Sequence, residues 1–352
     1  MHVALLANLK KNAPTWEGMS PDRWDDLDSE ETIADITRAL ESGGHKVTFL
    51  EGNIELAHRL PKVKPDICFN ISEGHFGDAR EAHVPAILEM LGIPYTGSRV
   101  LTLALTLDKP MTKRVLKYHN LPTPAFQAFE RANEPLDPDM TFPLFVKPSR
   151  EGTGMGVTPE SIVYNEEQLR AQLRIQLERY DQPILVEDYI KGREVTVGVV
   201  GNLAAPVARR IPDDVEAPRI QRGLTFLPPM EIDVDRYESE AGIYTSRIKT
   251  ELVHEFYWTC PANLDEEAVE ELNWLAAAIF RVTGCQDVAR VDFRLNEEED
   301  NKPYILEINP LPGLNPEYSD LCIEARAYGW TYEELVNRIL DEAAERQGLL
   351  DG

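Results

Sequence analysis

Hydrophobic and polar positions in the first hundred residues follow two periods in turn. Val3–Ala7, Val47–Leu50 and Asp66–Asn70 are short apolar runs typical of buried strands. Between and after them, helical spacing of apolar residues runs from Ser29 to Gly43–Gly44 and over Ala82–Leu91. Strands that alternate with helices predict a parallel sheet covered by helices, with ligands near the carboxyl ends of the strands.

The remaining chain reads as mixed helix and strand. Asp108-Lys109-Pro110 begins a new helix, and residues 209–247 mix charge, proline and glycine without a clear period, which is typical of a long excursion over a site. The other expected elements are strands Phe142–Val146, Ile184–Val186 and Val195–Val200, helices Glu166–Tyr180, Glu266–Val282 and Tyr332–Glu345, and a hairpin of Val288–Leu295 with Pro303–Ile308.

These patterns predict an α/β protein of three units. The expected divisions are an N-terminal α/β domain over residues 1–106, a small α+β subdomain over 107–188, and a larger α+β subdomain over 189–352. A chain of 352 residues is long enough for two or three packed units.

Charge and cysteine content narrow the class of protein. Lys and Arg number 36 against 61 Asp and Glu, a formal net charge of −25, which argues against binding nucleic acid or anionic membranes through basic patches. The four cysteines lack metal-type spacing. With no export signal and no apolar stretch near the ~18 residues of a membrane helix, we expect a cytoplasmic protein.

The first candidate site is a glycine-rich loop directly after a predicted strand. Lys147 ends the strand, and Gly152, Thr153 and Gly154 follow within seven positions. Glycines let backbone N–H groups approach phosphate oxygens, the threonine adds a hydroxyl donor and the lysine adds a positive charge. An ordinary turn with a solvated lysine is the alternative, and the loop lacks the Gly-Lys-Ser/Thr ending of a P-loop.

The second candidate site is the predicted hairpin. Alternation along a strand puts Arg290 and Asp292 on one face of the first strand and Glu307 and Asn309 on one face of the second. If the strands are neighbours, Asp292, Glu307 and Asn309 converge as oxygen ligands suited to Mg²⁺ bound with a nucleotide. The alternative is an exposed hairpin face with solvated charges.

With these two candidate sites, the chain resembles the ATP-grasp enzymes over nearly its whole length, and within them the D-alanine–D-alanine ligases. The resemblance is carried by segments 94–98, 107–109, 146–152, 185–187, 192–197, 260–262, 290–292 and 307–309 in this order. It implies an ATP-grasp fold and a reaction in which ATP phosphorylates a carboxylate to an acyl phosphate, which an amine then converts to an amide. It also implies two Mg²⁺ (Mn²⁺ as the alternative), amino-acid or peptide substrates, and a homodimer.

The resemblance also implies roles for single residues. Lys109 and Lys147 would bind phosphates, Glu187, Tyr189 and Ile190 would hold adenine, and Glu194 the ribose. Arg290 and the Gly313 N–H would stabilise the oxyanion, with Lys249 the active-site loop lysine and Arg247 its competitor. The remaining expected site residues are His75 on an active-site loop, and Glu31, Arg80, Glu81 and Ser319 in the amino-acid pockets. Two of these residues have alternative interpretations. Lys109 could merely begin a helix on the surface, and Arg290 could form a structural ion pair with a carboxylate.

Both amino-acid pockets depart from the family pattern. Asn8–Pro14 replaces the usual Gly-Gly-x-Ser-x-Glu, so a substitute carboxylate is expected between Asp25 and Glu31, and Ser319 is shifted by one and followed by an acid. Three functions therefore stay open. The leading one is D-alanine–D-alanine ligation, the second is ligation of other amino acids or peptides, and the third is nucleotide binding without ligation.

Overall fold

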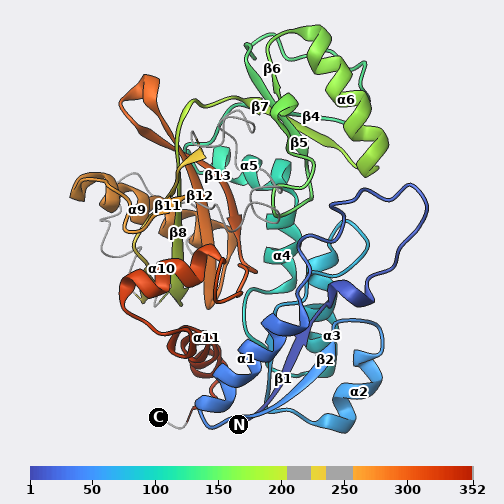
Figure 1. Ribbon diagram of the computed structural model, residues 1–352, viewed down its shortest axis with the longest axis vertical. Coiled ribbons are helices and arrows are strands. Elements are labelled where there is room, and N and C mark those ends of the chain that lie inside the picture. Colours follow the sequence, from blue (N-terminus) through green and yellow to red (C-terminus); the bar gives the residue numbers. More distant parts are fainter. Residues whose placement is uncertain (204–222, 235–256, 351–352) are drawn as a thin grey trace.

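The computed structural model describes residues 1–203, 223–234 and 257–350, which form three β-sheets with helices around them (Figure 1). In that view the parallel sheet of β1 and β2 lies at the lower end, the small sheet of β4–β7 at the upper right, and the sheet of β8, β12 and β13 between them on the left. The predicted α/β fold class is confirmed.

The first unit is a parallel sheet in the order β2-β1-β3. Side chains alternate across a strand, so Val3 and Leu5 of the central strand pack with helices α1 and α11, while Ala4 and Leu6 pack with α2 and α3. Its elements are β1 (His2–Ala7), α1 (Glu30–Ser42), β2 (Lys46–Glu51), α2 (Leu56–Val63), β3 (Ile67–Asn70), α3 (His83–Leu91) and α4 (Val100–Leu107).

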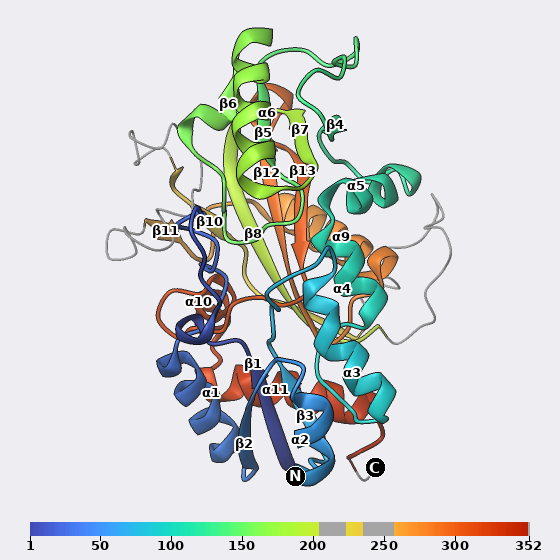
Figure 2. The ribbon, with the colours of Figure 1, turned by 90° about the vertical axis from the view of Figure 1, so that its right-hand side faces the viewer.

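The last helix, α11 (Tyr332–Arg346), belongs to the core of this first unit. Leu335 and Ile339 share one hydrophobic cluster with Val3 and Leu5, and the side-chain amide of Asn337 donates to the Ala39 carbonyl of α1 at 2.8 Å. Figures 1 and 2 both place α11 beside the parallel sheet. The predicted unit 189–352 thus contributes its final helix to the core of the predicted unit 1–106.

The second unit is a four-stranded antiparallel sheet in the order β4-β7-β5-β6, covered by one helix. Leu169 and Leu173 of that helix are fully buried in a cluster with Val146 and Val186 of the sheet. The elements are α5 (Lys109–Tyr118), which leads into the unit, β4 (Phe126–Phe129), β5 (Leu144–Pro148), β6 (Ile162–Val163), α6 (Glu166–Tyr180) and β7 (Ile184–Asp188).

The third unit is an antiparallel sheet in the order β11-β10-β8-β12-β13, with β9 pairing on β8. The predicted hairpin is confirmed as β12 and β13, and β12 also pairs along its whole length with β8. The elements are β8 (Gly192–Gly201), β9 (Leu224–Phe226), β10 (Met230–Ile232), β11 (Trp258–Thr259), α9 (Glu266–Thr283), β12 (Val288–Asn296), β13 (Lys302–Asn309) and α10 (Asp320–Tyr328).

Only residues 223–234 of the expected excursion 209–247 are described, and they contain the strands β9 and β10. That part of the excursion is therefore sheet rather than irregular chain. In the ranges the structure describes, no helix is both long enough and apolar enough to cross a membrane.

Candidate functional site

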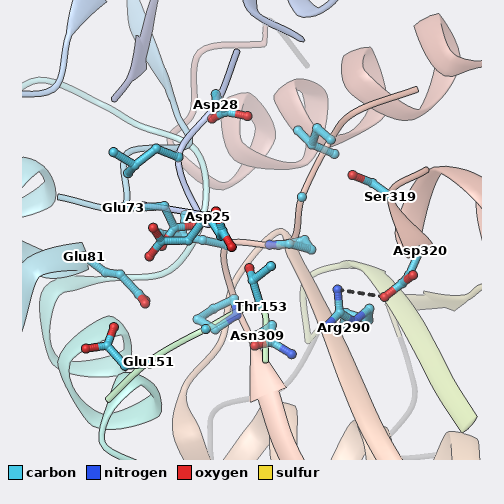
Figure 3. Close-up of a pocket in the computed structure, with 18 of the residues that line it drawn as sticks. Asp25, Asp28, Glu73, Glu81, Glu151, Thr153, Arg290, Asn309, Ser319 and Asp320 are labelled. Carbon is cyan, nitrogen blue, oxygen red and sulfur yellow. Dashed lines mark ion pairs between the residues drawn. The ribbon is translucent and has the colours of Figure 1, made fainter. Parts of the chain in front are cut away.

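Two adjoining cavities lie where the three units meet. The central cavity, of about 380 Å³, lies between loops of the first unit and the ends of the third sheet (Figure 3). The intersheet cavity, of about 100 Å³, lies between the second and third sheets. Lys109, Glu151 and Glu307 line both cavities, so a ligand group in one is next to a ligand group in the other.

The glycine-rich loop lies at the junction of the two cavities. Gly152 and Thr153 line the central cavity, and Gly154 lines the intersheet cavity. Thr153 and Gly154 both have positive φ, of 53° and 69°. Such left-handed backbone turns N–H groups to one side and forms the kind of concave surface that binds anions. The predicted loop residues thus all face the candidate site.

A buried trio of charges lies under the intersheet cavity. Lys147 Nζ is 2.6 Å from Glu187 Oε1, and Lys113 Nζ is 2.7 Å from Glu187 Oε2. Burial by itself would raise the pKa of Glu187, but the two lysines outweigh it and lower that pKa. Burial lowers the pKa of Lys113 to about 8, against the opposing effect of Glu187. Sequence reasoning missed Lys113, because a lysine inside a helical pattern carries no motif.

Lys109 connects the glycine-rich loop to the hairpin. At the start of α5, its Nζ donates to the Glu151 carbonyl at 2.6 Å and lies 3.2 Å from Glu307 Oε2. The side chain is only 10% exposed. Lys109 is therefore a cavity-lining charge and not a surface residue that merely begins a helix.

The hairpin residues meet across the two strands. Asp292 lies opposite Glu307, and Arg290 lies opposite Asn309. Arg290 donates from Nε and Nη2 to the two oxygens of Asp292 at 2.8 and 2.9 Å, and its Nη1 lies 3.2 Å from Asp320. The side-chain amide of Asn309 donates to Asp292 Oδ2 at 3.0 Å. These charges are largely buried, so the alternative of a solvated hairpin face is excluded.

The donor set of the hairpin fits Mg²⁺. Asp292 and Glu307 supply carboxylate oxygens from opposite positions of an antiparallel pair, and the Asn309 side chain, opposite Arg290, supplies an amide. Among the described residues there is no group of three or more His, Cys, Asp or Glu side chains suited to a metal. An ion here would therefore need phosphate or water oxygens as well, which is how proteins usually hold Mg²⁺.

The other predicted nucleotide residues line the intersheet cavity. Tyr189 and Ile190 follow β7, and the Tyr189 ring stacks on Phe145 with centroids 6.5 Å apart. Glu194, at the start of β8, lies 3.3 Å from Arg294. The cavity thus combines an aromatic wall with carboxylates.

The predicted substrate residues divide into two groups. Glu81 and Ser319 line the central cavity together with Gly313, the predicted oxyanion donor, and the Ser319 hydroxyl accepts from the Asn315 N–H at 2.9 Å. Glu31 is exposed on α1, and it does not line that cavity. Lys249 and Arg247 lie outside the described residues.

His75 and Arg80 also lie away from the lining of the central cavity. His75 borders a different hollow and packs edge-on against Trp24, with ring centroids 5.4 Å apart. Arg80 is buried behind the wall, where it donates to the Arg150 carbonyl at 2.6 Å and pairs with Asp26 at 3.0 Å. Arg80 therefore has a structural place between the first unit and the glycine-rich loop.

Asp25, Asp26 and Asp28 line the central cavity, within the range in which a substitute carboxylate was expected, and Glu73, which was not predicted, lines it as well. The signal for the three aspartates was the acidic stretch before α1, from which Glu31 was the expected carboxylate. Burial, with a smaller effect from Asp26, raises the pKa of Asp28 to about 7. A carboxylate with so high a pKa lacks sufficient positive charge around it.

The same loop also holds the glycine-rich loop in place. Asp22 Oδ2 accepts the Gly156 N–H at 3.0 Å and the Tyr180 hydroxyl at 2.9 Å, and Arg23 pairs with Glu151 at 2.7 Å. The loop before α1 thus reaches from the first unit to the second.

Comparison with known proteins agrees with this geometry. A family model described as D-ala D-ala ligase C-terminus matches residues 115–216 and 226–341. An uncharacterized protein from Sinorhizobium fredii is 35% identical, covering 89% of this chain and 88% of that protein. The D-alanine–D-alanine ligase of Syntrophotalea carbinolica is 34% identical, covering 96% and 97%.

A solved structure has the same fold over the full length. The D-alanine–D-alanine ligase of Bacillus anthracis complexed with ATP superposes with a TM-score of 0.71 at 23% identity, covering 99% of both chains. The predicted fold is thereby confirmed.

Proposed function

We propose, on the premise that this chain belongs to the D-alanine–D-alanine ligase family of ATP-dependent ligases, that it joins the carboxylate of one amino acid or peptide to the amine of another. One observation carries the proposal: Lys109, Glu151 and Glu307 line both cavities. A nucleotide in the intersheet cavity would therefore present its terminal phosphate to a carboxylate in the central cavity.

ATP would occupy the intersheet cavity. Glu187, Tyr189 and Ile190 would contact adenine, Glu194 the ribose, and Lys147 the phosphates, together with Lys109 and the N–H groups of the glycine-rich loop. The cavity of about 100 Å³ is smaller than the roughly 300–1,000 Å³ of typical ligand sites, so binding would require the second and third sheets to move apart. The ATP complex of the Bacillus anthracis ligase supports this assignment by its shared fold.

Asp292, Glu307 and Asn309 would hold one or two Mg²⁺, with Mn²⁺ as the alternative. When bound, the metal would neutralise charge on the phosphates. Arg290 already pairs with Asp292 and Asp320, so it offsets one of these two negative charges before the nucleotide arrives.

The chain's own residues would act mainly by positioning and by charge. A carboxylate oxygen of the first substrate attacks the terminal phosphorus, the bond to ADP breaks, and an acyl phosphate forms. The amine of the second substrate then attacks the carbonyl carbon, and inorganic phosphate leaves. Lys109 and Lys147 would offset negative charge in the first step, while Arg290 and the Gly313 N–H would stabilise the oxyanion in the second.

D-alanine is the specific substrate that the names of the relatives favour. With that substrate the reaction would form D-alanyl-D-alanine for cell-wall precursor synthesis; the family resemblance further implies a cytoplasmic homodimer. The acidic lining of the central cavity favours a second candidate, ligation of a different amino acid or a peptide. Binding of a nucleotide without ligation is opposed by the retained Arg290, Asp292, Glu307 and Asn309.

The test is ADP release from the purified protein with Mg-ATP, D-alanine and a panel of other amino acids, with products identified by mass. Release with D-alanine and formation of the dipeptide would support the specific assignment. Release with other substrates only would keep the ligase mechanism and replace the substrate. A folded protein that binds ATP but releases no ADP with any acid and amine would refute ligation.

A further inference from the structure

The central cavity has two chemically different sides. Figure 3 shows Glu73, Glu81 and Glu151 on one side, Arg290, Ser319 and Asp320 on the other, and Thr153 and Asn309 between them. The acidic side comes from the loop before α1, which contributes residues 25–28, and from the segment that follows β3, which contributes Glu73 and Glu81. We call Asp25, Asp26, Asp28, Glu73 and Glu81 the acidic wall.

The positive charges near the acidic wall do not balance it. Asp25 pairs with Lys10 at 2.8 Å, and Asp26 pairs with Arg80 at 3.0 Å. The other three members, Asp28, Glu73 and Glu81, form no ion pair within the residues that the structure describes. Arg80 cannot serve all of them, because it also lies 3.4 Å from Glu151.

A buried oxygen of the wall also lacks a partner. Asp26 lines the cavity with a side chain that is only 7% exposed, and its Oδ1 has no hydrogen-bond partner in the described structure. Buried polar atoms are nearly always hydrogen-bonded, and an unsatisfied one costs about 1–3 kcal/mol. A ligand that donates a hydrogen bond here would remove that cost.

Carboxyl groups of the acidic wall have raised pKa values, as expected where positive charge is insufficient. Burial raises the pKa of Glu81 to about 7 and that of Glu73 well above its ordinary value, and neighbouring carboxylates add to both effects. A metal ion is a poor match for the wall, since the described residues contain no group of three or more His, Cys, Asp or Glu side chains placed to hold one. An organic cation with several N–H donors matches better, because it can spread its hydrogen bonds over separated oxygens.

We propose that the amino acid whose carboxylate is activated carries a positively charged side chain, an ammonium or a guanidinium, held by Asp28, Glu73 and Glu81. The proposal rests on the proposed ligase function. The α-ammonium of any amino acid can pair with one or two wall carboxylates. Three unpaired carboxylates and a free Asp26 oxygen leave partners for a second cation.

The experiment isolates the acid-donating position by supplying hydroxylamine as the amine, which converts an acyl phosphate to a hydroxamate. The full-length protein with Mg-ATP is given lysine, ornithine, 2,4-diaminobutyrate or arginine, each as both enantiomers. Norleucine and alanine serve as uncharged comparisons. We expect kcat/KM for at least one basic amino acid to exceed that for norleucine by about tenfold or more, the value of one hydrogen bond to a charged group.

Variants connect that preference to the wall. Glu73→Gln and Glu81→Gln should each lower kcat/KM for the basic substrate by about tenfold, with KM for ATP within about twofold of the wild type. Glu270→Gln removes an equal charge from an exposed position on α9 and should change neither parameter. Each wall variant should melt no lower than the wild type, because it removes a buried carboxylate that forms no ion pair with any described residue.

Two outcomes would overturn the proposal. The first is turnover of alanine or norleucine at least as efficient as that of every basic amino acid, which removes the inference and leaves the ligase function intact. The second is a calorimetry experiment without ATP in which lysine and arginine bind neither the wild type nor the variants. If a basic amino acid binds the wild type but not Glu73→Gln or Glu81→Gln, and the protein makes no hydroxamate, the cation site is retained and ligation is refuted.

Discussion

Lys147 Nζ lies 2.6 Å from Glu187 Oε1, so the lysine proposed to bind phosphate is paired with a carboxylate of the proposed adenine site. Lys113 holds the other oxygen of Glu187 at 2.7 Å. When Lys147 turns toward a phosphate, Lys113 remains to balance the buried carboxylate. The trio therefore allows one lysine to move without leaving Glu187 unpaired.

Replacing Lys113 with methionine should weaken both folding and nucleotide binding. Lys147 would then be the main cation of Glu187, so it would be less available to phosphate. We expect the free energy of unfolding to fall by about 3–5 kcal/mol, the usual cost of breaking a buried ion pair from one side. KM for ATP should rise, and Arg114→Met, exposed on the same helix, is the matched control. An unchanged unfolding midpoint together with an unchanged KM would contradict this role.

Glu307→Gln should abolish most ADP release. It removes one of two opposed carboxylates from the proposed metal site and also the partner of Lys109. We expect turnover with Mg-ATP to fall about 100-fold or more, a typical effect of losing a group that offsets transition-state charge. Glu298→Gln, in the exposed turn of the same hairpin, should keep full activity. Normal turnover by a folded Glu307→Gln protein would remove the metal assignment.

Arg290→Lys should separate ATP binding from chemistry. The arginine holds both oxygens of Asp292 and reaches Asp320, a geometry that a single ammonium cannot reproduce. We expect kcat to fall about 10²–10³-fold through weaker stabilisation of the oxyanion. The dissociation constant for ATP, measured by calorimetry, should stay close to that of the wild type. Equal losses in ATP affinity and kcat would assign Arg290 to nucleotide binding instead.

Asp28→Asn should reduce the dependence of stability on pH. The pKa of Asp28 is about 7 in the folded protein against an ordinary 3.8, so the folded state binds the proton more tightly. Its contribution to stability is present at low pH and is lost as pH rises from about 4 to about 7. Chemical unfolding across this window should show a shallower loss in Asp28→Asn than in Glu270→Gln or the wild type. Parallel curves would contradict the raised pKa.

Elements with strong local signals could be predicted from the sequence alone. Helix α6 runs from Glu166 to Tyr180 as predicted, because the Asn165 side chain accepts from the Gln168 N–H at 3.0 Å and Asp181 ends it in left-handed backbone. No element was assigned to α4, whose Val-Leu-Thr-Leu-Ala-Leu-Thr-Leu sequence alternates like a strand. Its helix is supported by contacts distant in sequence, such as the Thr102 hydroxyl donating to the Thr283 carbonyl at 3.0 Å.

The candidate site likewise contains parts that the sequence could predict and parts that it could not. The glycine-rich loop and the hairpin each lie within one short segment, so their residue spacing predicts which side chains share a face. The acidic wall is different, because Asp28, Glu73 and Glu81 come from segments separated by up to 53 positions. Only the packing of the loop before α1 against the loop after β3 brings them together, and no periodicity in the sequence encodes that contact.

The position of α11 beside β1 has a consequence for how the protein is made. The core around Val3 and Leu5 includes Leu335 and Ile339, so the first sheet lacks one of its covering helices until more than three hundred further residues have been synthesised. During translation part of the apolar face of the sheet therefore stays exposed. The central strand of this sheet is thus fully covered only after the helix that lies farthest from it in the described sequence has formed.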